Sequence, residues 1–253
     1  MARLRPGGGA RVLVVAPHPD DEAAGCAGAL LLHASAGDEV RVAVVTDGRR
    51  SGAHGLGEEE MARCRRAEAA EAARALGAAR FEWLGFPEGG GAEAAITGEL
   101  ARLVADADVV YAPPFVDFHP EHLRVAACLA SAVQGGLVRV YQIQVPLARP
   151  LVNLVAEVDG VAEAFHETLG AYRTQRGALE RTLRTRRYAG ARHGGSRLVE
   201  EFWELPGTVY AALAREPDRR YRGLRRRAFS DPLAYLAGRG ARRALARRAR
   251  MNG

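Results

Sequence analysis

The chain has 253 residues, a length that fits one α/β domain with an extension. Hydrophobic residues make up 48% and charged residues 26%, as in ordinary globular proteins. All 36 basic residues are arginine, which excludes a catalytic lysine, a Schiff base and a P-loop lysine. The apolar run 12–16 is too short for a signal peptide or a membrane span, so we expect a cytoplasmic protein.

The three cysteines, Cys26, Cys64 and Cys128, are too few and too widely spaced for a disulfide framework or a zinc cluster. We expect them to be small core residues.

The net charge of +6 comes from the C-terminal part of the sequence. Between Arg215 and Arg250 there are thirteen arginines and only three acidic residues. We predict a flexible N-terminus at 1–10, a catalytic domain at 11–210 and an Arg-rich extension at 211–253. The extension is either a solvated tail or a segment in peripheral contact with an anionic surface. No nucleic-acid partner is expected, and the oligomeric state is left open.

Short apolar runs alternate with longer helical patterns along the chain. The predicted strands are 12–16, 38–46, 81–84, 108–112, 138–145 and 154–158. The predicted helices run to about 35 and then over 58–76, 97–105, 122–133, 161–173 and 177–185. Continuous apolar strands that alternate with helices indicate an α/β fold with a mostly parallel sheet and helices on both faces.

The polar segments PHPDDE, TDGRRSG, LGFPEGG and PPFVDFHPEH follow the first four predicted strands in turn. Ligands of parallel sheets bind at the carboxyl ends of the strands. We therefore expect these four loops to meet and form the functional site.

His18 and Asp21 stand three residues apart in the first of these loops, and His122 follows the fourth strand. A catalytic zinc site needs three protein ligands and one open position for water. Two imidazoles and one carboxylate suit zinc, with iron(II) as the alternative. We predict one metal ion per chain at these residues.

Asp20 lies beside a predicted ligand, so its carboxylate is the candidate general base for the attacking water. His119 is the candidate donor to the oxyanion, and it is also the candidate acid for the departing amine. Asp117 is expected to orient His119. The other histidines lack such company and are predicted to be surface or packing residues, with His54 the nearest to the site; they are His33, His54, His166 and His193.

Together, these motifs resemble the PIG-L or LmbE-like zinc deacetylases. PHPDDE (17–22) after VLVVA and HPEH (119–122) carry most of the resemblance. Further matches are RRAEAAEAARALG (65–77), LGFPEG (84–89), LGAYRTQ (169–175) and LVEEFW (198–203). The similarity spans about residues 11–203.

The resemblance implies a Rossmann-like fold and removal of the acetyl group from an N-acetylglucosaminyl conjugate, a small molecule. It implies that His18, Asp21 and His122 bind zinc, and that Arg65 and Glu88 bind sugar hydroxyls. Some family members have Tyr at the position of Asp117, where it helps to hold the oxyanion. An ionised acid does not do this, so more of that role falls to His119 and zinc.

The sequence leaves three other functions to be weighed. An amidase for a longer acyl chain or conjugate would use the same residues. A non-catalytic sugar-binding protein on the same fold would not need Asp20. A nucleotide-binding domain is disfavoured, because HPDDE rather than G-x-G-x-x-G follows the first strand.

Overall fold

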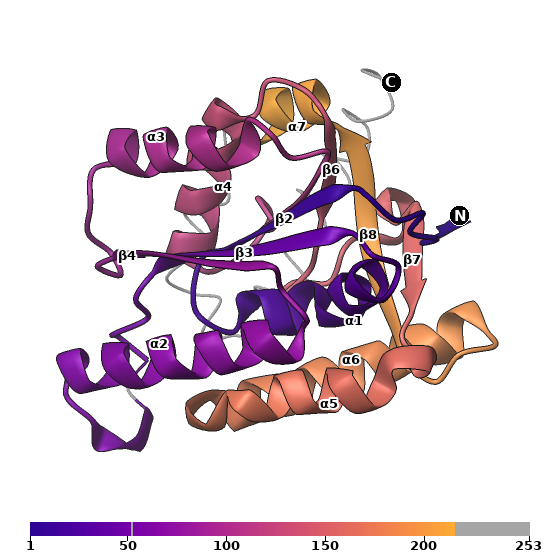
Figure 1. The fold of residues 1–253 in the computed structure, drawn as a ribbon, viewed down its shortest axis with the longest axis horizontal. Coiled ribbons are helices and arrows are strands. Elements are labelled where there is room, and N and C mark those ends of the chain that lie inside the picture. The colour runs from indigo at the N-terminus through magenta and orange to yellow at the C-terminus, as the bar shows by residue number, and fades with distance from the viewer. Residues whose placement is uncertain (52, 216–253) are drawn as a thin grey trace.

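The computed structural model describes residues 1–51 and 53–215. Its eight strands form one sheet in the order β1-β7-β8-β6-β5-β2-β3-β4 (Figure 1). The strands are β1 Ala2–Arg3, β2 Arg11–Ala16, β3 Glu39–Thr46, β4 Arg80–Phe86, β5 Val109–Ala112, β6 Leu137–Val140, β7 Leu154–Glu157 and β8 Val199–Pro206. The α-helices are α1 Asp21–Ser35, α2 Glu58–Ala75, α3 Glu93–Val104, α4 Pro120–Ala132, α5 Ala162–Ala171, α6 Arg176–His193 and α7 Gly207–Ala214.

The helices cover the sheet on both faces, as predicted (Figure 1). Val12 and Val14 of β2 pack in the same core cluster as α1, α2 and α5. Leu13 and Val15, which alternate with them, pack in the cluster that contains α3, α4 and α7. Because successive side chains of a strand point to opposite faces, this short apolar run contributes to both cores at once.

Two elements of the sheet differ from the prediction. The strand expected over 138–145 ends at Val140, and the chain then turns into a loop where Gln142 accepts a hydrogen bond from the Leu147 backbone N–H at 2.8 Å. The antiparallel strand β8 was not predicted and lies between β6 and β7. Its adjacent glutamates, Glu200 and Glu201, make it unlike an apolar strand, although both are buried and paired.

The two ends of the described chain also differ in detail from the expectation. Ala2–Arg3, expected to be loose, pairs in parallel with β7. Helix α7 crosses the predicted boundary at 210/211 and packs in the core through Leu213 and Ala214. The rest of the predicted basic extension, from residue 216, lies outside the described residues. None of the described helices combines the length and apolar character required to span a bilayer.

A buried polar network joins the end of α1 to the sheet. His33 Nδ1 lies 2.6 Å from Asp38 Oδ2, and its Nε2 lies 3.1 Å from the Tyr111 hydroxyl and 2.9 Å from Arg139 Nη1. Arg139 also donates to Glu204. Because Arg139 can only donate, His33 Nε2 must accept, which requires a neutral ring. Burial lowers the pKa of His33, and the Arg139 charge adds to this effect against the pull of Asp38.

This network predicts a specific loss of stability in acid. A histidine whose pKa is lowered in the folded state binds its proton more tightly in the unfolded chain, so stability falls as pH drops below the unfolded pKa of about 6.5. Between pH 7.5 and 5.5, His33 should contribute a loss of about 1 kcal/mol in the free energy of unfolding. Urea titrations of wild type and His33→Gln at both pH values would measure it.

His166→Gln is the matched control, because His166 is exposed and lies outside this network. The wild type and the control should lose more stability in acid than His33→Gln. An equal pH dependence in all three proteins would contradict the assignment of a neutral, buried His33.

Candidate metal centre and active site

The structure brings the polar loops of the first four long parallel strands into one cleft at the carboxyl edge of the sheet, as the sequence predicts. Seven of the eight predicted site residues line this cleft: His18, Asp20, Asp21, Arg65, Glu88, His119 and His122. Asp117 is fully buried behind them. Residues of α6 and the loop after β6 close the cleft on the other side.

Two imidazoles converge on one carboxylate oxygen at the floor of the cleft. Asp21 Oδ2 lies 3.0 Å from His18 Nδ1 and 3.3 Å from His122 Nε2. Ligand bonds of 2.0–2.1 Å in a tetrahedral zinc site place neighbouring ligand atoms about 3.3 Å apart. All three side chains are buried. The donor types and their spacing therefore fit a divalent metal ion.

A carboxylate stands behind each of these imidazoles. Glu88 Oε1 lies 3.5 Å from His18 Nε2, and Asp117 Oδ2 lies 3.3 Å from His122 Nδ1. Carboxylates in this position fix the tautomer and the orientation of a metal-binding histidine. His18 Nε2, Asp117 Oδ2 and His122 Nδ1 are buried and make no hydrogen bond within the described part of the chain.

These contacts differ from two expectations. Asp117 was expected to orient the His119 ring, but its carboxylate faces the His122 ring. It accepts hydrogen bonds from the backbone N–H groups of Phe118, at 2.5 Å, and His119, at 2.9 Å. Glu88 was expected to bind sugar hydroxyls, but it faces His18 and accepts a hydrogen bond from the Arg50 backbone N–H at 3.0 Å. Sequence spacing could not decide which of two neighbouring histidines a carboxylate faces.

The electrostatic field of the site favours a cation. Burial lowers the pKa of His122, but Asp21 and Asp117 outweigh it and raise this pKa well above its ordinary value. At Glu88, burial opposes ionisation, yet the contact with His18 lowers the pKa to about 2. The carboxylates of the site therefore provide the negative charge that a divalent ion needs.

His119 differs from the other two histidines in its contacts. It is the N-cap of α4, and its Nδ1 accepts a hydrogen bond from the Glu121 backbone N–H at 3.3 Å. Burial lowers the pKa of His119 to about 4, and the neighbouring imidazoles add to this effect. The ring is therefore neutral, and its Nε2 carries the proton. A neutral Nε2–H is suited to donate a hydrogen bond to an oxyanion.

His119 also stands close enough to be a metal ligand. One nitrogen from each of His18, His119 and His122 lies within 4.8 Å of the others. The shorter distances from Asp21 to the two other imidazoles favour Asp21 as the third ligand and leave His119 for substrate.

Asp20 is held in a strained conformation at the start of α1. Its φ is 121°, a value that residues other than glycine rarely adopt and that often marks functional sites. Burial raises the pKa of Asp20 to about 6, although Arg65 opposes the shift. A carboxylate with a pKa in this range is suited to accept a proton near neutral pH.

Arg65 holds Asp20 rather than facing open space in the cleft. Its Nη2 donates to Asp20 Oδ1 at 2.6 Å and to the Pro19 carbonyl, and its Nη1 donates to the Gly48 carbonyl at 3.4 Å. Only 4% of Arg65 is exposed. The expected contact with sugar hydroxyls therefore differs from what the structure shows, because these donors are used within the protein.

Two further acids support the same loops, and sequence analysis did not assign them a role. Glu22 accepts a hydrogen bond from the Tyr172 hydroxyl, which ties α1 to the end of α5. Glu68 accepts from the Thr174 backbone N–H at 3.0 Å and from its hydroxyl at 2.7 Å. For Glu68, the sequence contained one signal, the R-x-x-E pattern in which it follows Arg65 by three residues. Both side chains lie on the face of α2 that meets the site.

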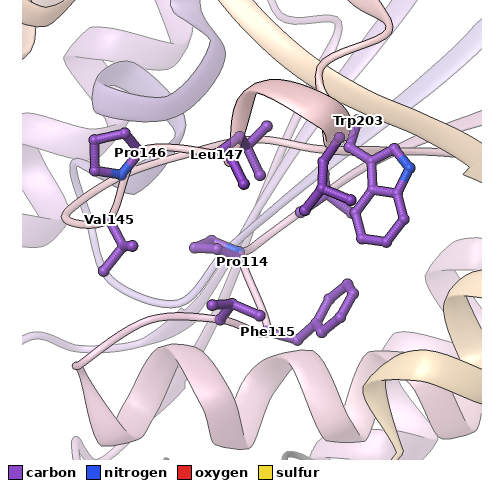
Figure 2. Close-up of a pocket in the computed structure, with 10 residues that line it drawn as sticks. Pro114, Phe115, Val145, Pro146, Leu147 and Trp203 are labelled. Atoms are coloured by element: carbon purple, nitrogen blue, oxygen red, sulfur yellow. The ribbon is translucent and has the colours of Figure 1, made fainter. Parts of the chain in front are cut away.

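An apolar pocket lies behind the loop that leads to His119 (Figure 2). Figure 2 shows the six labelled side chains around it: Pro114, Phe115, Val145, Pro146, Leu147 and Trp203. The Phe115 ring lies 5.8 Å from the Trp203 ring and 5.7 Å from the Tyr210 ring. No titratable side chain lines the pocket. It supports the loop by packing and is separate from the polar cleft.

Comparison with known proteins bears on the same residues. Residues 13–133, which include both histidine motifs, match the family model described as PIG-L, GlcNAc-PI de-N-acetylase. The sequence is also 30% identical, over 174 residues, to 2'-N-acetylparomamine deacetylase of Streptomyces fradiae. That match covers 58% of this chain and 60% of the relative.

The fold of this chain is similar to that of solved structures. One is N,N'-diacetylchitobiose deacetylase from Pyrococcus horikoshii, with a TM-score of 0.65 and 22% identity over 79% of this chain and 85% of that one. Another is the 4-carboxy-2-hydroxymuconate hydratase GalB from Pseudomonas putida, with a TM-score of 0.66 and 17% identity over 81% and 96% of the two chains. Because a deacetylase and a hydratase both have this fold, function must be argued from the site.

The contact between Asp117 and His122 predicts an effect on metal binding. Asp117→Asn removes the charge that fixes the His122 ring, and zinc affinity should fall about tenfold, as is common when such a partner is lost. Competition with a chromophoric chelator would measure the dissociation constant. Glu121→Gln is the matched control, since Glu121 is also buried but bonds to Gly89 and Arg124. Equal affinity in wild type and Asp117→Asn would refute the assignment.

Proposed function

We propose that the protein is a zinc-dependent hydrolase that removes an N-acetyl group from an amino sugar, such as an N-acetylglucosaminyl conjugate. The observation that carries the proposal is the convergence of His18 Nδ1 and His122 Nε2 on Asp21, with the strained carboxylate of Asp20 alongside. The match to the PIG-L family model and the similarity to the S. fradiae relative, both described as deacetylases, support it.

His18, Asp21 and His122 would hold one zinc ion, with iron(II) as the alternative metal. When bound, the ion supplies a Lewis acid that lowers the pKa of water and polarises the amide carbonyl. The remaining chemistry belongs to the protein's own side chains. The cytoplasmic location stays a prediction.

Asp20 accepts the proton of the attacking water, and Arg65 keeps its carboxylate in place. Water adds to the amide carbon, and His119 Nε2–H donates a hydrogen bond to the oxygen that becomes negative. The C–N bond then breaks. Asp20 gives the proton that it has taken to the departing amine, either directly or by way of His119. The products are acetate and a primary amine.

Two alternative functions differ from this proposal, one in the acyl group that is removed and the other in the absence of catalysis. An amidase for longer acyl chains would use the same side chains, and a panel of N-acyl glucosaminides of increasing chain length would separate it from a deacetylase. A non-catalytic sugar-binding protein would bind these compounds saturably and release no amine. The half-buried, strained Asp20 favours an enzyme, since a binding site does not need a general base.

Adjacent aspartates give a sharp test of the mechanism. Asp20→Asn should retain one zinc per chain and lose turnover by about 10³-fold, because it removes only the base. Asp21→Asn should lose both zinc and turnover. Metal analysis, together with release of primary amine from an N-acetylglucosaminide, would measure both. Asp20→Asn with the parent rate would show that another group is the base.

The charge of the cleft rim bears on the carrier of the sugar. The three acids of the cleft are all engaged: Asp20 with Arg65, and Asp21 and Glu88 with the histidines. Arg50 and Arg181 also line the cleft, and neither side chain has an ion-pair partner within residues 1–51 and 53–215. Both are exposed. We therefore propose that the carrier is neutral or acidic rather than polycationic.

Reversal of charge at Arg181 tests this proposal. Arg181→Glu should lower the ratio of kcat/KM for an acidic over a basic N-acetylglucosaminide by about tenfold at low salt, and less at high salt because ions screen exposed charges. Arg184→Glu is the matched control: it lies on the same helix, is exposed and does not line the cleft. The same change in both variants would reject a specific role for Arg181.

A further inference from the structure

Helix α1, which carries Asp21 in its first turn, is interrupted at Cys26. The backbone of Cys26 has φ −154° and ψ 20°, outside the helical range. In an unbroken helix the carbonyls of Ala24 and Gly25 would accept hydrogen bonds from the N–H groups of Gly28 and Ala29. The interruption leaves these four buried groups to find other partners.

One buried ion pair satisfies all four groups. Arg186 Nη2, from α6, donates to the carbonyls of Ala24 at 2.5 Å and Gly25 at 2.8 Å. The carboxylate of Glu200, from β8, accepts from the N–H groups of Gly28 at 3.1 Å and Ala29 at 2.8 Å. Arg186 Nε lies 3.7 Å from Glu200 Oε1. The two side chains thus make four hydrogen bonds to the backbone of α1 around the interruption.

The pair is completely enclosed. Arg186 is 1% exposed and Glu200 is 0% exposed. A buried ion pair is weak evidence for stability, because apolar residues of similar size are often as stabilising at the same position. Its geometry instead suggests a role in shape. It opens the helix on one side, where Gly25 packs directly against the Tyr141 ring and leaves no room for a Cβ.

The short helical segment 21–25 is therefore held separately from the rest of α1. Arg186 holds its carboxyl end, while Arg65 holds the Pro19 carbonyl and the Asp20 carboxylate just before it. Asp21 lies between these two attachments. A straight α1 would change the direction of this segment relative to the sheet and hence the position of the Asp21 carboxylate.

We propose that Arg186 and Glu200 are positioning residues, which keep α1 open at Cys26 so that Asp21 reaches both His18 and His122. The inference rests on the proposed function, because it assigns Asp21 as a metal ligand. In the contacts described above, neither side chain touches His18, Asp21 or His122. Their effect on the metal is therefore transmitted by the backbone of α1.

The test is the zinc affinity of Arg186→Met/Glu200→Gln, measured on the full chain by competition with a chromophoric chelator. Removal of both charges allows the two helix hydrogen bonds to form again. The zinc dissociation constant should rise at least tenfold, while circular dichroism shows a folded protein. Wild-type affinity in the folded variant would overturn the proposal.

A matched control separates positioning from general loss of stability. Arg139 and Glu204 form a second buried to half-buried Arg–Glu pair, with Nε and Oε2 2.8 Å apart, that contacts no residue of segment 21–25. Arg139→Met/Glu204→Gln should lower the midpoint of thermal unfolding but leave the zinc dissociation constant within threefold of wild type. Equal weakening of zinc binding in both double variants would overturn the positioning role.

The remaining outcomes are also decisive. If the Arg186→Met/Glu200→Gln variant does not fold, Glu200→Gln alone decides by the same measurement, with at least a threefold loss expected and wild-type affinity overturning the proposal. If the wild type binds no zinc, the proposed function fails and this inference fails with it. If the wild type binds zinc and the folded variant binds it equally well, only this inference fails.

Discussion

The contact of two imidazoles with one aspartate oxygen is the interaction on which the rest of the site depends. His18 and Asp21 are local neighbours, but His122 comes from the first turn of α4, about a hundred residues later. Bringing these buried polar groups together is costly unless each finds a partner. Glu88 and Asp117 behind the imidazoles, and Arg65 behind Asp20, provide those partners. The candidate centre is therefore a cluster of paired polar groups rather than three isolated ligands.

Buried arginines shape the backbone around this cluster. Arg65 and Arg186 both donate to backbone carbonyls on either side of Asp21, and both are almost fully enclosed. The planar guanidinium, with several donors at fixed angles, can satisfy two carbonyls and a carboxylate at once. The same fold supports a deacetylase and a hydratase. The proposed deacetylation therefore rests on the identity of the side chains in the cleft and not on the arrangement of strands.

The sequence by itself determined the class of fold and brought together most residues of the candidate metal centre. Continuous apolar strands such as 12–16 require helices on both faces, and the carboxyl ends of parallel strands share one edge, so the loops with His18 and His122 had to meet. These inferences depend on short-range pattern and on general rules of sheet topology. They did not extend to β8, because Glu200 and Glu201 are charged in isolation and become compatible with a buried strand only through Arg186, Arg192 and His193.

Only the tertiary structure decided which carboxylate serves which imidazole, and what the arginines do. Asp117 is two residues from His119 but faces His122, and Arg65 binds Asp20 from a different helix. Such choices depend on side-chain direction and on distances of about 3 Å, which sequence spacing does not encode across loops. The interruption of α1 is a further case, since the ion pair that stabilises it comes from residues more than 150 positions away, in α6 and β8.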